Sequence, residues 1–318
     1  MHSVFTAQRR SDCGCADNGS ISATQAVADA GRLAEAVGDL RLRSAELSAA
    51  SGLWAWQRRV LALSLAFLGI GVALAPEATL IGLLAVMAVP FLCVVVLRRV
   101  ALWQLAHPLP KPPPAAASPV PLPVYTVLVP LYREAGVVGD LLASLRALDY
   151  PADRLEVMLI VEAVDGETRA ALACTQLDAH MQVLVVPEGA PRTKPRATQY
   201  ALQFARGEYV VVYDAEDAPE PDQLRRALAA LSAGGKRLGC LQAQLNIYNS
   251  DATWFTRQFT IEYTALFDCI LPTLERLRLP VPLGGTCSTL SAAGIPTTSP
   301  RTPTSASAWR AAAGMSAC

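Results

Sequence analysis

The sequence has few histidines, no CxxC cysteine pair and no net charge. It contains three histidines (His2, His107 and His180) and eight scattered cysteines in 318 residues. We therefore expect no zinc site, and the cysteines are more typical of reduced intracellular thiols than of a disulfide framework. Basic and acidic residues balance at 27 each, so no global basic field points to a nucleic-acid partner.

Two nucleotide-binding fingerprints are also missing. No GxxxxGK[ST] segment occurs, and the only close glycine pair of the dinucleotide kind, Gly69-Ile-Gly71, lies inside an apolar run. The sequence therefore lacks both the P-loop and the dinucleotide-binding pattern.

Two long apolar runs indicate a membrane protein. Val60–Pro76 and Leu80–Leu97 hold 17 and 18 residues without a charge. As helices they would each be about 26 Å long, at the short end of what crosses a hydrocarbon core of about 30 Å. We predict a transmembrane hairpin within residues 53–106, with spans at about 60–76 and 80–97. The alternative is a buried helical hairpin in a soluble bundle.

The charges around these runs predict their orientation. Arg58-Arg59 precede the first run, Arg98-Arg99 follow the second, and Glu77 is the one charge between them. Positive charge on both outer flanks places both ends of a hairpin in the cytoplasm. We therefore expect a multi-pass inner-membrane protein.

The segments that flank the hairpin differ in composition. Residues 1–52 are polar, with an amphipathic helix or helix pair expected within Ser22–Ser51, where Leu33 and Val37 follow a helical spacing. Such a helix packs on its own domain, binds a partner or lies on a membrane. Residues 107–124 contain eight prolines, which predicts a stiff spacer.

From residue 125 to 291 the pattern alternates between strands and helices. Near-continuous apolar strands that alternate with helices predict an α/β fold, with a mostly parallel sheet and helices on both faces. The expected strands are Tyr125–Val129, Leu155–Val161, Gln182–Val186, Tyr209–Tyr213 and Leu238–Ile247. The expected helices are Ala135–Leu148, Thr168–Ala179, Pro195–Arg206, Asp222–Ser232 and Trp254–Leu271.

Three carboxylates follow the strand at Tyr209–Tyr213. Asp214, Glu216 and Asp217 stand where ligands bind in open α/β sheets, outside the carboxyl ends of the strands. They repel one another unless a cation joins them, and hard divalent ions prefer carboxylate oxygens together with substrate phosphates. The alternative is an acidic turn that caps the next helix.

Two further polar clusters fall at predicted strand ends. The basic run Arg192–Arg196 opens a helix, where cations are unfavourable unless an anion such as a diphosphate is bound. Glu162 and Asp165 follow the second strand. By itself the basic run reads as a solvated loop, but three clusters at one sheet edge predict a nucleotide-sugar site.

Five segments carry a resemblance to a known family. VPLYREAGVV, PRTKPRATQYAL, VVYDAEDAPEPDQLRRAL, FTIEYTALFD and VPLGGT lie in this order between Tyr125 and Thr286. They resemble processive family-2 glycosyltransferases of the cellulose-synthase-like group. The resemblance implies a GT-A (Rossmann-like) domain facing the cytoplasm. It also implies a nucleoside diphosphate sugar, commonly UDP-linked, with Mg²⁺ or Mn²⁺ as cofactor.

The resemblance also assigns roles by position. It places the nucleotide sugar against Pro130, Tyr132, Glu134, Glu162, Asp165 and Lys194. It places the metal at Asp214 and Glu216, with Asp217 beside them, and leaves open whether Glu216 or Asp217 completes the metal shell. It places the acceptor near Gln242 and the turn formed by Gly284, Gly285 and Thr286.

The reaction implied is sugar transfer, with inversion at the anomeric carbon, to a growing polysaccharide. A metal and Lys194 would neutralise the leaving diphosphate, and a base would deprotonate the acceptor hydroxyl. The alternatives are a single addition to a lipid-linked acceptor, or a non-catalytic module that binds a nucleotide sugar or a partner. In the family the base is the Asp of a TED motif, and this sequence contains no TED.

Residues 292–318 change to a Ser/Thr/Pro-rich composition, which predicts a disordered tail. If the reading frame is shifted by one base, the codons of Ala292–Arg310 can encode GGWDPYNVTEDADLGIRLA, which resembles the family's missing segment. We therefore interpret the tail as out of frame. The chain as written is then expected to be inactive, with no catalytic residue for the base.

Overall fold

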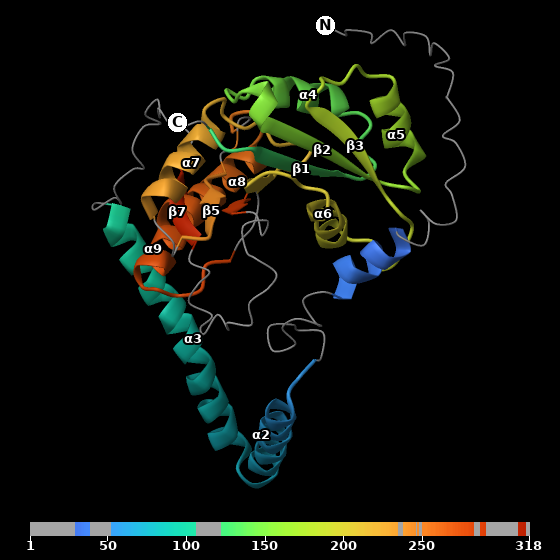
Figure 1. The fold of residues 1–318 in the computed structure, drawn as a ribbon. Coiled ribbons are helices and arrows are strands. Elements are labelled where there is room, and N and C mark those ends of the chain that lie inside the picture. Colours follow the sequence, from blue (N-terminus) through green and yellow to red (C-terminus); the bar gives the residue numbers. More distant parts are fainter. Residues whose placement is uncertain are drawn as a thin grey trace, which may run out of the picture.

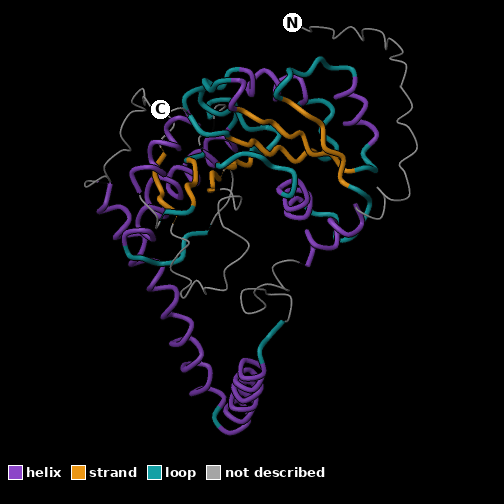
Figure 2. Tube along the Cα trace, in the orientation of Figure 1, coloured by secondary structure: helices purple, strands orange, loops and turns teal. Residues whose placement is uncertain are grey.

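The computed structural model describes residues 29–38, 52–105, 122–234, 238–245, 247, 250–282, 287–290 and 311–315. Within these ranges the chain forms one mixed sheet with helices on both of its faces, and a pair of long helices that projects away from it (Figures 1 and 2).

The sheet has seven strands in the order β3-β2-β1-β4-β6-β5-β7. The first four strands in this order are parallel; they are β3 (Met181–Val186), β2 (Leu155–Glu162), β1 (Tyr125–Leu131) and β4 (Tyr209–Val212). β6 (Cys287–Leu290) runs antiparallel between β4 and β5 (Cys240–Ala243), and β7 (Ala311–Met315) is parallel to β5. The expected α/β class with a mostly parallel sheet is confirmed.

The two faces of the sheet are covered by different helices. β1 sends Val127 and Val129 to one face and Leu128 to the other, because successive side chains of a strand alternate. The first face is covered by α4 (Val138–Arg146), α5 (Gly166–Ala173) and α7 (Gln223–Gly234). The second face is covered by α6 (Lys194–Leu202), and the helix of residues 29–38 packs beside it.

A helix covers residues 29–38, within the segment where the sequence predicts an amphipathic helix or helix pair, and it packs on its own domain. Leu33 and Ala36 contact the core beneath α6. The remainder of Ser22–Ser51 lies outside the described residues. Of the three outcomes left open by the sequence, the structure shows packing on the chain itself.

The segment expected as one helix from Trp254 to Leu271 is three consecutive elements. These are α8 (Trp254–Thr264), the π-helix η5 (Ala265–Ile270) and α9 (Leu271–Arg276). Thr253 starts α8, because its hydroxyl accepts a hydrogen bond from the Thr256 amide at 3.1 Å. The π-helical register makes a widened turn that apolar periodicity does not reveal.

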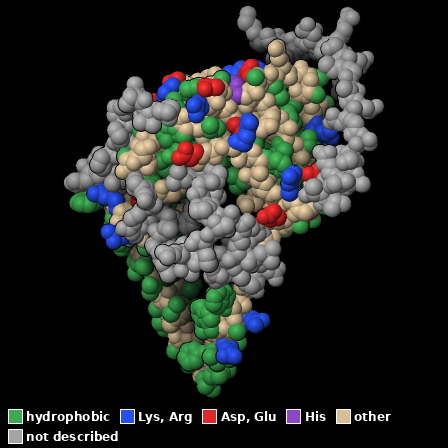
Figure 3. All heavy atoms as spheres, viewed as in Figure 1, with side chains coloured by type: hydrophobic (Ala, Val, Ile, Leu, Met, Phe, Trp, Pro, Cys, Tyr) green, Lys and Arg blue, Asp and Glu red, His purple; other side chains and the backbone are tan. Residues whose placement is uncertain are grey.

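The two apolar runs form a helical hairpin. α2 (Ala55–Leu74) and α3 (Pro76–Leu105) are both long and apolar enough to cross a membrane by length and composition. Their large apolar side chains are mostly exposed, and Figure 3 shows hydrophobic atoms covering the projecting pair. This exposure disfavours the alternative of a hairpin buried in a soluble bundle.

α3 is longer than the expected span. It continues through Arg98-Arg99 to Leu105, because nothing in the sequence interrupts it there. Its end packs against η5 and α9, where Ala101 is buried and Arg276 Nη1 donates to Gln104 Oε1 at 3.3 Å. The last turns of α3 therefore join the hairpin to the α/β domain.

Three segments differ from the sequence expectation. β5 covers four residues of the ten expected to be extended, and β6 was not predicted. β7 lies in the tail for which no folded element was predicted. Short strands whose pairing partners are distant in sequence carry little local pattern, because the sheet supplies most of their stabilisation. Most of the proline-rich spacer, residues 106–121, lies outside the described residues.

A buried carboxylate joins the strands at their amino ends. Glu156 in β2 accepts hydrogen bonds from Thr126 Oγ1 at 2.7 Å, and from the amide and Nε of Arg206 at 2.9 and 2.7 Å. Thr126 Oγ1 in turn accepts from the Gly207 amide at 2.9 Å. Glu156 is therefore a structural acid, at the sheet edge opposite to the carboxylates that follow β4.

Gly207 has no room for a side chain. A Cβ there would lie 2.6 Å from the Thr126 amide nitrogen and 2.8 Å from the Tyr209 carbonyl oxygen. We predict that Gly207→Ala lowers the free energy of unfolding by about 1–3 kcal/mol through overpacking. Gly139→Ala, on an open face of α4, should raise it by about 0.5–1 kcal/mol. Thermal unfolding of both variants in detergent tests this, and equal effects would contradict it.

Candidate functional site

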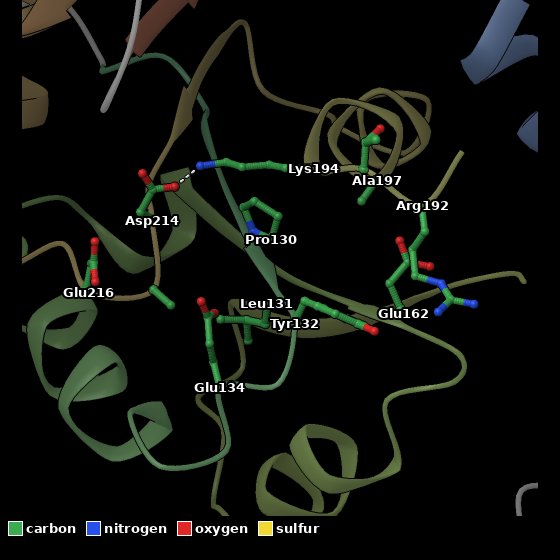
Figure 4. Close-up of a pocket in the computed structure, with 12 residues that line it drawn as sticks. Pro130, Leu131, Tyr132, Glu134, Glu162, Arg192, Lys194, Ala197, Asp214 and Glu216 are labelled. Carbon is green, nitrogen blue, oxygen red and sulfur yellow. Dashed lines mark ion pairs between the residues drawn. The ribbon is translucent and has the colours of Figure 1, made fainter. Parts of the chain in front are cut away.

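A cavity of about 410 Å³ opens at the carboxyl ends of the central strands. The wall is formed by the end of β1 and the residues after it, the last residue of β2, the residues after β4, and the start of α6 with the residues just before it (Figure 4). The lining residues are Pro130, Leu131, Tyr132, Glu134, Glu162, Arg192, Thr193, Lys194, Ala197, Asp214, Ala215 and Glu216. The cavity therefore lies where the three polar clusters of the sequence were expected to meet.

The loop after β1 is held in place by Asp165. The Arg133 amide donates to Asp165 Oδ2 at 2.5 Å, and the Thr168 amide donates to Asp165 Oδ1 at 3.1 Å. The Glu134 amide donates to Thr168 Oγ1 at 3.0 Å, and Arg133 adopts a positive φ of 60°. Asp165 thus caps α5 and fixes the backbone that presents Tyr132 and Glu134 to the cavity.

The carboxyl of Asp165 is buried, and burial by itself opposes ionisation. The hydrogen bonds from the Arg133 amide and from Thr168 outweigh that effect and lower the pKa of Asp165 below its ordinary value. Asp165 does not line the cavity, although the family resemblance assigned it to the nucleotide sugar. Its observed contacts are those of a positioning residue.

Glu162, the last residue of β2, is paired with Arg196 of α6. Arg196 Nη2 donates to Glu162 Oε2, and Nη1 donates to the Gly189 carbonyl oxygen. Both side chains are almost fully buried, at 2% and 7% exposure. This ion pair ties β2 to α6 and to the loop before α6. The sequence reading included Arg196 in the basic run, but gave it no role.

Lys194, at the start of α6, extends towards Asp214 after β4 and forms an ion pair with it (Figure 4). Burial lowers the pKa of Lys194, and the carboxylates of Asp217, Glu134 and Glu216 oppose that shift. Burial, together with repulsion by Glu216, raises the pKa of Glu134 against a hydrogen bond to the Tyr132 backbone. In this cavity, one lysine side chain therefore lies close to several carboxylates.

The turn after β4 separates the three acidic residues. Asp217 Oδ2 accepts a hydrogen bond from the Asp214 amide at 2.8 Å, and the Asp217 amide donates to the Asp214 carbonyl at 3.0 Å. Asp214 and Glu216 line the cavity, whereas Asp217 closes the turn beside it. Among the described residues, no group of three His, Cys, Asp or Glu side chains is arranged to hold a metal by itself. Two carboxylates and the oxygens of a bound diphosphate are nevertheless a donor set that suits Mg²⁺.

Of the expected acceptor residues, the structure describes Gln242. Gln242 is buried in β5, where it pairs in register with Cys287 of β6, and it does not line the cavity. Gly284, Gly285 and Thr286 lie outside the described residues. Arg192, Thr193 and Ala197 complete the wall on the α6 side. Of these, only Arg192 stood out in the sequence.

We predict that Asp165→Asn lowers the free energy of unfolding by about 1–3 kcal/mol, because a neutral amide satisfies fewer of the buried donors. The folded-state pKa of Asp165 lies below the ordinary value of 3.8. This contribution is therefore fully present above the unfolded pKa, and is lost as the pH falls through the lower folded-state pKa. Unfolding of wild type and variant between pH 3 and 7 measures this. An exposed control, Asp153→Asn, should change stability by less than about 0.5 kcal/mol. A difference independent of pH would contradict the prediction.

Comparison with known proteins gives several partial matches. The beta-monoglucosyldiacylglycerol synthase of Synechocystis sp. (strain ATCC 27184 / PCC 6803 / Kazusa) is 31% identical over 142 residues, covering 44% of this chain and 29% of that protein. Cellulose synthase 2 of Novacetimonas hansenii is 28% identical over 151 residues, covering 47% of this chain and 9% of that protein. The chain thus spans well under half the length of these relatives.

Among solved structures, the mannosyltransferase PcManGT from Pyrobaculum calidifontis, in complex with GDP-Man and Mn²⁺, is 25% identical. The match covers 65% of this chain and 55% of that chain, with a TM-score of 0.47. The family described as Glycosyltransferase like family 2 matches residues 122–295, more than half of the chain, and these residues include the whole cavity. The chain therefore belongs to glycosyltransferase family 2.

Proposed function

We propose that this protein is a membrane-bound glycosyltransferase whose α/β domain takes a sugar from a nucleoside diphosphate sugar, with UDP as the nucleotide. One observation carries the proposal: the cavity brings Asp214 and Glu216 together with Lys194 and Arg192 at the start of α6. Carboxylates suit a divalent cation, and cationic side chains at the start of a helix suit a diphosphate. The family match covers the same residues.

Asp214 and Glu216 would hold Mg²⁺ or Mn²⁺, and Asp217 would shape the turn that presents them. When bound, the ion would neutralise charge on the leaving diphosphate. Lys194 would supply a second positive charge from the opposite wall of the cavity. The nucleotide pocket would be lined by Pro130, at the end of β1, and by Tyr132 and Glu134, on the loop that Asp165 fixes.

For the acceptor we favour a growing polysaccharide, with inversion at the anomeric carbon. Cellulose synthase 2 and glucomannan 4-beta-mannosyltransferase 2 of Arabidopsis thaliana, 26% identical over 153 residues, support this class. A second candidate is a single addition to a lipid acceptor. The observation that favours it is the 31% identity to beta-monoglucosyldiacylglycerol synthase. In both cases α2 and α3 would anchor the domain in the inner membrane with the cavity on the cytoplasmic side.

The sequence as written contains no TED motif to supply the base. We infer that the chain binds its donor but does not turn it over, and that a one-base shift near residues 287–292 separates it from an active product. The remaining candidate is a binding module without catalysis. This candidate requires that the chain binds a nucleotide sugar stably and that the frame-restored product also transfers no sugar.

We predict that UDP binds the purified chain in Mn²⁺, and that Asp214→Asn weakens this binding by about tenfold or more. Loss of a charge that faces a metal and a diphosphate costs at least ~1.4 kcal/mol. Isothermal titration with and without Mn²⁺ separates the metal-dependent part. Asp153→Asn is the control, because Asp153 is an exposed residue that does not line the cavity. UDP affinity unaffected by both Mn²⁺ and Asp214→Asn would refute the metal assignment.

The same titration distinguishes the two candidate second ligands. Glu216→Gln should remove most of the effect of Mn²⁺, because Glu216 lines the cavity. Asp217→Asn should leave most of the effect of Mn²⁺ in place. It should also lower thermal stability, because the Asp217 carboxylate accepts a hydrogen bond from the Asp214 amide. The opposite ranking would make Asp217 the ligand.

An assay of sugar transfer tests the inference that the chain lacks its catalytic base. The chain as written should release no UDP from UDP-sugars above background, whereas the product of a frame-restored gene should turn over. Resequencing the genomic DNA across the codons of residues 284–318 decides first whether the shift lies in the gene. Steady transfer by the chain as written would disprove the inferred inactivity.

A further inference from the structure

We propose that the helix of residues 29–38 is a positioning element for the donor site, and that Leu33 is its key residue. It acts on the 187–193 loop, which connects β3 to α6 and carries Arg192 two residues before Lys194. The role rests on the proposed function, because it concerns the geometry of the proposed phosphate-binding wall.

The helix is fixed to α6 by polar contacts as well as by packing. Tyr200 Oη donates to Asp29 Oδ1 at 3.3 Å, and Gln203 Nε2 donates to the Arg32 carbonyl at 2.9 Å. The Arg32 guanidinium lies 4.9 Å from the centre of the Phe204 ring. Figure 1 shows the helix, in blue, beside α6. Contacts of three kinds define one orientation of the helix.

Leu33 reaches from this helix to the 187–193 loop. A Cβ added to Gly189 would lie 2.6 Å from Leu33 Cδ2 and 3.1 Å from Arg196 Nη1. The Leu33 side chain therefore packs directly on the backbone of Gly189, at the place where a larger residue would have its Cβ. Arg196, held by Glu162, donates to the Gly189 carbonyl oxygen. Gly189 is thus held by an apolar contact and a charged hydrogen bond.

The loop itself adds few hydrogen bonds to these two contacts at Gly189. Within the described part of the chain, residues 187–192 make no backbone–backbone hydrogen bond. Arg192 is exposed, and its salt-bridge contact with Glu188 is 3.8 Å long at the surface. Side-chain contacts at Gly189 therefore determine where the loop carries Arg192 and how it enters α6 at Lys194. Small displacements of residues that position a ligand reduce affinity and catalytic rate.

The test compares substitutions at two neighbouring residues of the helix, Leu33, which is half-buried, and Ala34, which is exposed. Leu33→Asp places a charge against Gly189 and the core under α6, whereas Ala34→Asp adds the same charge on the exposed face. The full-length chain in detergent is titrated with UDP in Mn²⁺. Trypsin cleavage after Arg192 is followed by mass spectrometry in the absence of nucleotide. Thermal unfolding shows whether each variant is folded.

We expect Leu33→Asp to weaken UDP binding roughly 3- to 10-fold and to speed cleavage after Arg192. Ala34→Asp should match the wild type in both. Leu33→Ala removes the contact without burying a charge, so it should show the same two changes at smaller size even if Leu33→Asp does not fold. Unchanged affinity and cleavage in Leu33→Ala would overturn the proposal.

The two readouts separate this inference from the proposed function. If the wild type binds no UDP, the proposed function fails. Cleavage after Arg192 then still shows whether Leu33 holds the loop, and no change in cleavage would overturn that part as well. If the wild type binds UDP and all Leu33 variants bind equally well, the donor site stands and the positioning role is wrong.

Discussion

The buried ion pair between Glu162 and Arg196 connects most parts of the proposed donor site. Two charges taken out of water are costly unless each finds its partner and further hydrogen bonds, and Arg196 also donates to the Gly189 carbonyl. The pair therefore joins the end of β2, the body of α6 and the loop between β3 and α6. Lys194 stands two residues before Arg196, so its position follows from the same anchor. Leu33 packs on the same glycine, Gly189.

Acidic residues at opposite edges of one sheet have different roles. Glu156, at the amino ends, is fully engaged by Thr126 and Arg206, and holds the strands together. Asp214 and Glu216, after the carboxyl end of β4, line an open cavity, where Asp214 pairs with a half-exposed lysine. The residue type does not separate these cases. What separates them is whether the protein itself satisfies the carboxylate oxygens.

The hairpin is connected to the domain through a short contact. The last turns of α3 pack on η5 and α9, while the apolar surfaces of α2 and the rest of α3 are exposed. In the proposed membrane setting, this contact would set the distance between the bilayer and the cavity. An acceptor extending from the membrane, whether lipid or polysaccharide, would then meet a donor site held at a fixed height.

The sequence by itself determined the class of the fold and the place of the site. Continuous apolar strands followed by polar residues are sufficient to predict a parallel sheet with a site at its carboxyl edge. The residues that follow parallel strands all lie at that edge, where ligands bind in such sheets. The family motifs identified Tyr132, Glu134, Lys194, Asp214 and Glu216, and the structure places all five around one cavity. Only the tertiary structure decided that Asp165 and Asp217 accept hydrogen bonds from backbone amides, that Arg196 donates to the Gly189 carbonyl oxygen, and that Leu33 packs on Gly189. These roles depend on contacts between segments distant in the chain or on how a turn closes, and spacing along a sequence contains neither.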